Sequence, residues 1–286
     1  MIKTVAVIGG TGMLGKPVSE AFARAGYRVV VVSRNASKAA AVFNPQLDIT
    51  VREADMFHPA QLEQALHDAD AIHINLSGNS PATYEKNHIQ GTEAVLRAKP
   101  THTQLITMIS TATAYPQNDF RVDTKAKLAA EQLLKESGTH YMTYLPSWFY
   151  ETLELLVDTN TVTTMCDATQ PLHWVSAESF ANAVVDSYQQ PSLFNRRLTL
   201  FGPEKMTINE AADKYAEHMG YQRFHMSNEE AISYAKDTQD DTLLDAVDLL
   251  LYTEKVGEHA DPKTLDHPLV LGSHFENWLD TRVTGS

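Results

Sequence analysis

The sequence feature that most constrains this chain is a glycine-rich loop between a short apolar run and an amphipathic segment. Residues 5–8 are all apolar, as expected of a strand buried on both faces of a parallel sheet. The loop at residues 9–15 has the spacing G-x-G-x-x-G from Gly10 and G-x-x-G-x-x-G from Gly9, and a helix is expected at 16–25. This context predicts a turn that binds a pyrophosphate; a tight turn without a ligand is the alternative.

Apolar runs and helical patterns alternate through the first half of the chain. Strands are expected at residues 5–8, 29–32, 49–51, 71–76, 104–109 and 141–145, and helices at 16–25, 35–43, 59–69, 82–98 and 123–137. Such alternation predicts βαβ units with right-handed crossovers. The expected fold is therefore α/β, a Rossmann doubly wound parallel sheet with helices on both faces, whose ligand crevice lies at the carboxyl ends of the strands.

The alternation stops after about residue 147. Helical patterns dominate at 177–188, 207–219, 228–236 and 240–255, with short strands expected at 173–175, 197–201 and 224–226. The sequence shows no Gly/Ser linker and no internal repeat. We expect residues 1–147 to form an NAD(P)-binding Rossmann domain, and residues 148–286 to form a smaller, mostly helical lobe that is intertwined with it.

The end of the second expected strand distinguishes between the two nicotinamide cofactors. An acidic residue at this place grips the ribose hydroxyls of NAD. This chain has Ser33 and Arg34 instead, with Lys38 a turn later. Arginine offers forked donors to a 2′-phosphate, so the sequence favours NADP(H) over NAD(H). The alternative for Arg34 is a solvated turn residue.

Other residues are expected at the cofactor because they follow strands. Asp55 is suited to accept from the adenine amino group and Met56 to lie against the ring, although Asp55 is equally suited to cap the next helix. The small Ser77, after Leu76, lets the chain pass the cofactor. The residues expected to hold the pyrophosphate are Gly9, Thr11, Gly12, Met13 and Leu14.

Longer motifs make the chain similar to the extended short-chain dehydrogenases/reductases, and specifically to their atypical, NmrA-like branch. The motifs are residues 7–12, Ser33-Arg34, Asn87 with Gly91-Thr92, and residues 109–115, 127–134, 145–151 and 198–203. The resemblance implies an NAD(P)-binding Rossmann fold over most of the chain. It also implies that Ser110, Pro146 and Lys127 contact the cofactor.

The resemblance further implies a catalytic set with one departure. In catalytic members a Ser or Thr, a Tyr, and a Lys four residues after the Tyr act together, and these positions fall on Thr111, Asp123 and Lys127. An ionised Asp123 cannot donate a proton as a phenol does. A surface ion pair with Lys127 or a helix N-cap is the structural alternative for Asp123. Tyr115 lies at a strand end and lacks the spacing.

The missing tyrosine shapes the expected function. The resemblance implies an NADPH-dependent oxidoreductase acting on a quinone or another small conjugated carbonyl. Trp148 and Phe149 would then flank the substrate, or else form a hydrophobic seam between the lobes. The alternative is an NADP(H)-sensing regulatory protein without turnover, and a sugar-nucleotide epimerase or dehydratase is a third, less favoured hypothesis.

Composition limits which binding partners and which cellular compartment are expected for this protein. Lys and Arg number 23 against 36 Asp and Glu, a net charge of −13 with no basic run, which argues against nucleic acid and anionic membranes. The single cysteine, Cys166, is expected to be a buried hydrophobe. No signal or membrane segment is recognisable, so a cytoplasmic protein is expected. The twelve histidines are dispersed, which predicts no metal site. A small-molecule substrate is expected, and a homodimer or protein partner stays open.

Overall fold

The computed structural model describes residues 1–258, 268–272 and 274–283. An eight-stranded parallel sheet lies at its centre, with the order β14-β11-β6-β5-β4-β1-β2-β3. Its strands are β1 Thr4–Ile8, β2 Arg28–Ser33, β3 Ile49–Glu53, β4 Ala71–Ile74, β5 Leu105–Ile109, β6 His140–Pro146, β11 Arg196–Phe201 and β14 Leu269–Val270. The strand order reverses at the β1–β4 pair, which in such sheets opens a crevice for a ligand. The expected doubly wound fold is confirmed.

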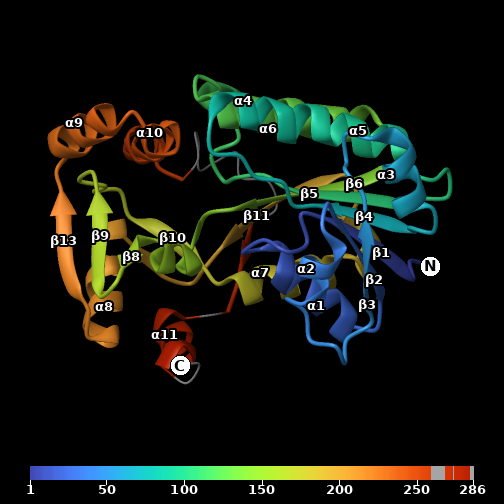
Figure 1. Cartoon of the computed structure of the whole chain (residues 1–286), viewed down its shortest axis with the longest axis horizontal. Helices are drawn as coiled ribbons and strands as arrows, with labels where there is room; N and C mark the ends of the chain where they lie inside the picture. The colour runs from blue at the N-terminus through green and yellow to red at the C-terminus, as the bar shows by residue number, and fades with distance from the viewer. Residues whose placement is uncertain (259–267, 273, 284–286) are drawn as a thin grey trace.

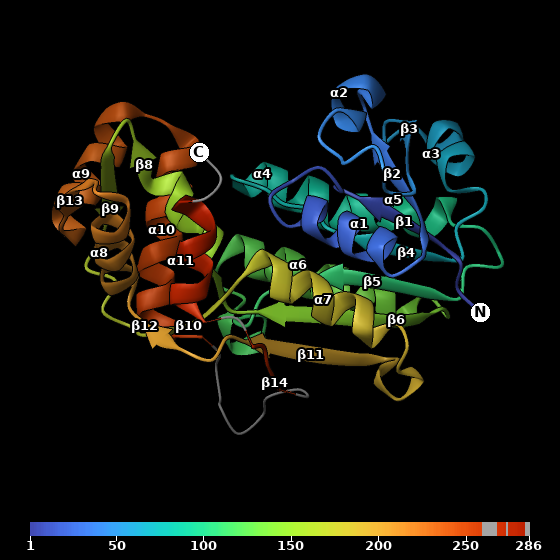
Figure 2. The same ribbon diagram turned by 90° about the horizontal axis from the view of Figure 1, so that it is seen from below.

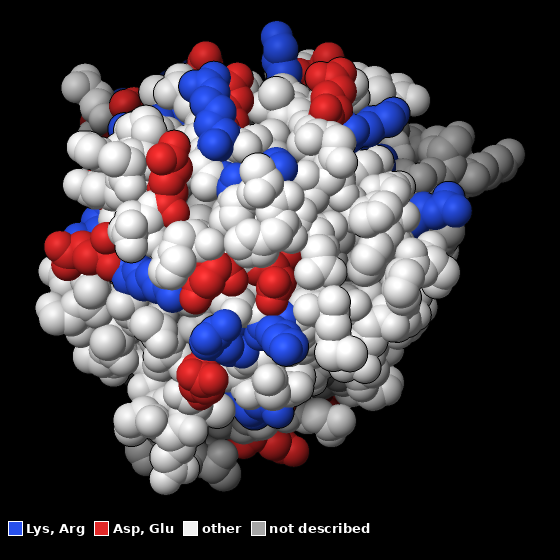
Figure 3. Space-filling model, turned by 90° about the vertical axis from the view of Figure 1, so that its right-hand side faces the viewer, with Lys and Arg blue, Asp and Glu red and all other residues white. Residues whose placement is uncertain are grey.

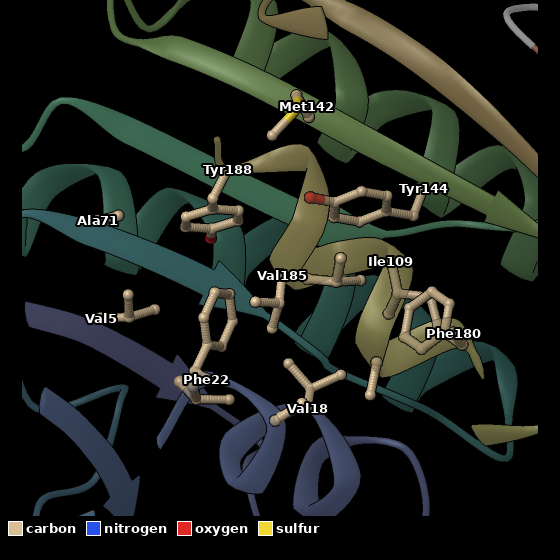
Figure 4. Packing of buried hydrophobic residues seen from close by; sticks show 14 of the residues in the cluster. Val5, Val18, Phe22, Ala71, Ile109, Met142, Tyr144, Phe180, Val185 and Tyr188 are labelled. Carbon is tan, nitrogen blue, oxygen red and sulfur yellow. The ribbon is translucent and has the colours of Figure 1, made fainter. Parts of the chain in front are cut away.

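Helices cover both faces of this sheet (Figure 1). On one face lie α3 Pro59–Leu66, α5 Gly91–Ala98 and α6 Val122–Glu136, and on the other α1 Gly15–Arg24 and α7 Ala177–Ser187. Figure 4 shows Val18 and Phe22 of α1 and Phe180 and Val185 of α7 packed beneath the strands. Burial of each such side chain stabilises the folded protein by about 1.5–3 kcal/mol. The helices therefore hold the strand ends, and the loops after them, in fixed places.

Several polar groups inside this core pair with one another. The Tyr188 hydroxyl lies 2.8 Å from Thr107 Oγ1, and His73 Nδ1 lies 2.9 Å from the same atom. Tyr144 makes a 2.7 Å hydrogen bond with Ser187. Burial lowers the pKa of His73 to about 3, so its imidazole is neutral in the folded protein.

The second part of the chain builds two small three-stranded sheets with helices around them (Figure 2). Its elements are β7 Trp148–Phe149, the 3-10 turn Tyr150–Leu156, β8 Val157–Asp158, β9 Thr161–Met165, β10 Leu172–Val175, β12 Lys205–Met206, α8 Ile208–Met219, β13 Gln222–Met226, α9 Asn228–Thr238, α10 Asp241–Val256 and α11 Phe275–Val283. Tyr150, Trp174, Phe275 and Trp278 form its aromatic core. The sequence patterns did not predict β8, β9 or α11.

Several element boundaries differ from those expected. The helix expected at 82–98 is three segments: α4 Pro81–Tyr84, a π-helical turn Glu85–Gln90, and α5. The helix expected at 35–43 is shorter, α2 Ala36–Ala40, with Asn35 as its N-cap. Although they follow residue 147, β11, β14 and α7 belong to the large sheet and its cover. The division of the chain at that residue stays a prediction.

None of the described helices is long and apolar enough to cross a membrane. Cys166 is buried, as predicted. Figure 3 shows the end of the molecule near the N-terminus, where Lys and Arg side chains are interspersed with Asp and Glu. Within the described residues no group of three or more His, Cys, Asp or Glu is placed to hold a metal ion, and His259 and His267 lie outside those residues.

Candidate functional site

Two hollows lie at the carboxyl ends of the strands and share part of their lining. The outer groove, of about 560 Å³, runs along the glycine loop and past the ends of β2, β3 and β4. The inner pocket, of about 360 Å³, extends from the same loop toward α6, β7 and the end of α10. Met13, Leu14, Asn75, Leu76 and Ser77 line both hollows. A long ligand could therefore reach from one into the other.

The glycine loop is held against β4 by very close backbone contacts. Gly9 has φ +77°, and a Cβ there would lie 2.1 Å from the Asn75 carbonyl oxygen. A Cβ on Gly15 would lie 2.0 Å from the Gly9 carbonyl oxygen. A Cβ on Gly12 would meet only that same carbonyl, at an ordinary 3.6 Å, so the protein's own packing does not demand a glycine there. The loop thus leaves open backbone that suits a pyrophosphate, and the residues present fit a dinucleotide.

The structure gathers the predicted binding residues at these two hollows. The outer groove is lined by Gly9, Thr11, Gly12, Met13, Leu14, Ser33, Arg34, Asp55, Met56, Leu76 and Ser77. The inner pocket is lined by Ser110, Thr111, Lys127, Pro146, Trp148 and Phe149. The Ser110 hydroxyl donates to Glu131 at 2.5 Å, which turns it away from a ligand. The roles of these residues stay predictions.

The end of β2 has an acidic neighbour that the sequence reasoning missed. Ser33 and Glu53 are direct partners in the β2–β3 register, and Glu53 Oε2 accepts from the Ala36 backbone N–H at 3.2 Å. The exposed Arg34 directly follows Ser33, so a carboxylate lies beside the strand end that carries this arginine. Only the parallel register of the two strands could have revealed the neighbour.

Asp55 does not cap the following helix. Its Oδ1 accepts from the Phe57 backbone N–H at 2.9 Å, a local turn. The helix α3 begins later, with His58 at the N-cap position. The capping interpretation of Asp55 is therefore wrong, because the chain makes one more turn before the helix starts.

Asp123 forms the expected ion pair with Lys127, but the pair is buried and not on the surface, and the N-cap interpretation is wrong. Asp123 is the second residue of α6 and only 6% exposed, and Arg121 occupies the N-cap position. Its carboxylate lies 2.8 Å from Arg121 Nε and 3.6 Å from Lys127 Nζ. Burial works to lower the pKa of Arg121, but Asp123 and Asp245 outweigh it and raise that pKa. Asp123 thus belongs to a buried charge cluster that reaches α10.

Two aromatic predictions are clarified by the packing. Trp148 and Phe149 line the inner pocket, whereas Tyr150 and Glu151, which follow them, are buried within the second lobe. Trp148 Nε1 donates to Thr152 at 2.9 Å, which fixes the indole at the pocket wall. Tyr115 is buried, and the Arg197 guanidinium lies over its ring, 5.0 Å from the ring centroid. Tyr115 does not line the inner pocket.

The inner pocket also contains polar residues that no sequence signal identified. Glu258, just after α10, is buried and accepts from Ser147 Oγ at 2.9 Å and from His173 Nδ1 at 2.8 Å. Burial alone would raise the pKa of Glu258, but the hydrogen bonds from His173 hold it below its ordinary value. Tyr84 and His88 reach the pocket from α4 and the π-helical turn. Glu258 and Tyr84 come from segments without a recognisable motif, and His88 follows Asn87 in a motif that did not itself point to the histidine.

Solved structures with the same fold bind nicotinamide cofactors or are described as acting on sugar nucleotides. An NADPH-dependent quinone oxidoreductase from Escherichia coli, complexed with NADPH, is 20% identical and has a TM-score of 0.73, with 98% of this chain and 99% of that chain covered. A nucleoside-diphosphate-sugar epimerase from Staphylococcus aureus is 18% identical at TM-score 0.69, covering 96% and 99%. The leucoanthocyanidin reductase of Vitis vinifera with NADPH is 14% identical at TM-score 0.68, covering 98% and 99%. At these identities the likeness shows a shared fold.

Sequence comparison defines the family. No curated protein matches the chain. The family model described as NAD(P)H-binding matches residues 9–191, which is more than half of the chain and includes both the glycine loop and Lys127. The chain therefore belongs to the NAD(P)H-binding family.

Proposed function

We propose that the protein is an NADPH-dependent oxidoreductase that transfers a hydride to a quinone or another small conjugated carbonyl. The observation that carries this proposal is the inner pocket, which opens from the glycine loop and has aromatic walls at Trp148 and Phe149. A nicotinamide ring that follows the loop inward would enter this pocket. Its about 360 Å³ suits one ring system beside the nicotinamide.

The charges of the pocket favour a neutral substrate over a sugar nucleotide. Among its described lining residues Lys127 is the single Lys or Arg. It is paired with the Asp123 carboxylate, and Glu258 adds a second carboxylate to the lining. A nucleoside diphosphate needs several cationic donors, as phosphate recognition generally does. An uncharged, flat carbonyl compound fits these surroundings better.

The proposal assigns separate roles in cofactor and substrate binding to the residues of the two hollows. Bound NADPH supplies the hydride. The glycine loop holds the pyrophosphate, Arg34 binds the 2′-phosphate, and Lys127 holds the nicotinamide ribose. Thr111 orients the substrate carbonyl, while Trp148 and Phe149 exclude water around it. Asp123, paired with Arg121 and Lys127, lacks the phenol hydroxyl of the tyrosine in catalytic members. A reduced quinone takes its protons from solvent, which suits a site without a tyrosine.

The test is NADPH consumption over a panel of benzoquinones and naphthoquinones, with simple aldehydes and a sugar nucleotide for comparison. We expect turnover with quinones and none with the sugar nucleotide. Trp148→Ala should raise KM more than it lowers kcat, because it removes a wall of the pocket. Tight NADPH binding without turnover of any compound would contradict the proposal.

Tight NADPH binding without turnover is the outcome that the alternative function predicts. A regulatory protein that senses NADP(H) would bind the cofactor through the same groove and need no proton donor. The replacement of the tyrosine by Asp123, locked in ion pairs, is the observation that favours it.

A further inference from the structure

His88 occupies an unusual turn of backbone beside the charge cluster of the inner pocket. It lies in the π-helical turn Glu85–Gln90, which interrupts an otherwise continuous helix. Such turns are rare and often occur at functional sites, because the extra residue re-aims neighbouring side chains. His88 is 2% exposed and lines the inner pocket together with Lys127 and Asp123.

The imidazole is fixed in orientation but incompletely bonded. Its ring stacks on Tyr84, with centroids 6.0 Å apart and an interplanar angle of 9°. Tyr84 is itself tied down, since its hydroxyl donates to Asp245 and lies 3.5 Å from Arg121 Nη2. Yet Nε2 of His88 is buried and has no hydrogen-bond partner among the described residues. An unpaired buried nitrogen costs about 1–3 kcal/mol. Other buried polar atoms of the described residues also lack a partner, such as His73 Nε2, but of these residues His88 alone lines the inner pocket.

The surroundings keep this histidine neutral. Burial lowers the pKa of His88 to about 3, the positive charge of Lys127 lowers it too, and Asp123 acts in the opposite sense. A neutral imidazole has one ring nitrogen that accepts a hydrogen bond. Lys127 has three N–H donors on a flexible stem, and within the described residues it makes one ion pair, to Asp123, which is long at 3.6 Å. His88, with its unsatisfied acceptor, and Lys127, with its unused donors, thus line the same pocket.

We propose that His88 is a positioning residue for Lys127, whose ammonium donates to His88 Nε2 on the side not occupied by Asp123. With two of its three N–H groups held by Asp123 and His88, the lysine directs the third at the ribose of the cofactor. This inference rests on the proposed role of Lys127 in holding NADPH. The proposal also assigns a role to the π-helical turn, which would orient the imidazole of His88 toward Lys127 on α6.

The proposal is tested by nitrogen-detected NMR on the full chain saturated with NADP⁺. The His88 ring should stay neutral from pH 8 to pH 5, with Nδ1 protonated and Nε2 bare. The Lys127 ammonium should give a slowly exchanging signal, which His88→Phe abolishes and His88→Gln retains, since glutamine offers an acceptor at a similar reach. His102→Gln, on the exposed loop before β5, is the matched control and should change nothing.

Calorimetry with NADPH gives a second readout. His88→Phe should weaken binding roughly tenfold, the effect of one hydrogen bond to a charged group, while His88→Gln restores most of it. A protonated Nε2, a histidine that titrates near neutral pH, or unchanged binding and lysine signal in His88→Phe would each overturn the inference. These measurements need no turnover, so inactivity toward quinones would defeat the proposed function and leave the role of His88 standing.

Discussion

At the scale of single residues, the substitution of a carboxylate for a phenol at position 123 reorganises its neighbours. Asp123 pairs with Arg121 and Lys127, and Arg121 in turn binds Asp245 and Asp248 on α10. A tyrosine at this place would leave the buried guanidinium with less negative charge around it. The departure from the reductase pattern is therefore part of the charge balance of this chain.

Two of the three carboxylates on Arg121, those of Asp123 and Asp248, provide a matched test of burial. Asp123→Asn should lower the free energy of unfolding by about 1–3 kcal/mol, because it weakens the charge balance of a buried arginine. Asp248→Asn removes a partner whose side chain is 67% exposed, and should cost less than about 0.5 kcal/mol. Urea titration of the two variants measures the difference. Equal losses would show that burial does not govern this cluster.

The corner between Arg34 and Glu53 should set the cofactor preference. Arg34→Asp is expected to weaken NADPH binding roughly 10- to 100-fold, as for a lost charge-assisted hydrogen bond, and NADH binding far less. Glu53→Gln should instead strengthen NADPH binding, because it removes a negative charge next to the 2′-phosphate. Calorimetry with both cofactors distinguishes these effects. Loss of both cofactors to the same degree in Arg34→Asp would remove the 2′-phosphate assignment.

His73 should make the stability depend on pH. Its pKa is about 3 in the folded protein and near 6.5 when unfolded, so the unfolded state binds the proton first as the pH falls. Below about pH 6.5 this histidine removes about 1.4 kcal/mol of stability per pH unit, down to its folded pKa. His73→Gln should flatten the slope of unfolding free energy against pH by that amount. The slope of His102→Gln should match that of the unaltered protein.

At the scale of elements, α11 joins the two parts of the chain through one carboxylate. Glu151 accepts from Trp278 Nε1 at 2.9 Å and from the Ala177 backbone N–H, at the start of α7, at 3.0 Å. Burial raises the pKa of Glu151, and the hydrogen bond from Ala177 only partly offsets this. A buried acceptor with such partners is costly to leave unpaired.

Replacement of Trp278 tests this connection. Trp278→Phe keeps an aromatic ring against Tyr150 but removes the donor to Glu151, and should lower the free energy of unfolding by about 1–3 kcal/mol. Trp278→Ala should cost about 3–5 kcal/mol, because it also opens a cavity in the aromatic core. Chemical denaturation measures both changes. If the two losses were the same, the hydrogen bond rather than the packing would account for the whole effect.

At the scale of the whole molecule, the two hollows form because distant segments return to the edge of one sheet. The glycine loop and the ends of β2, β3 and β4 make the outer groove from the first third of the chain. The inner pocket adds α6, β7 and the end of α10, more than a hundred residues later. The outer groove is thus built from neighbouring strands early in the chain, whereas the inner pocket depends on how the second lobe packs against them.

The sequence by itself determined the sheet, the glycine loop and most residues that line the outer groove. These follow from local rules: buried parallel strands are apolar, tight turns need glycine, and ligand loops follow strands. Asn35 as an N-cap is a further case of this kind. The resemblance to the short-chain dehydrogenases/reductases pointed to Lys127 and Thr111, and both line the inner pocket.

Tertiary structure alone decided the polar side of the inner pocket and the surroundings of Asp123. Glu53 meets Ser33 through strand register, Glu258 meets Ser147 across 111 residues, and His88 lines the same pocket as Lys127. No local pattern marks such contacts, since their energies arise from burial and from charges brought together only in the folded chain. The same reason explains why Asp123 was expected at the surface and lies buried: its partner Arg121 is anchored by a helix 120 residues away.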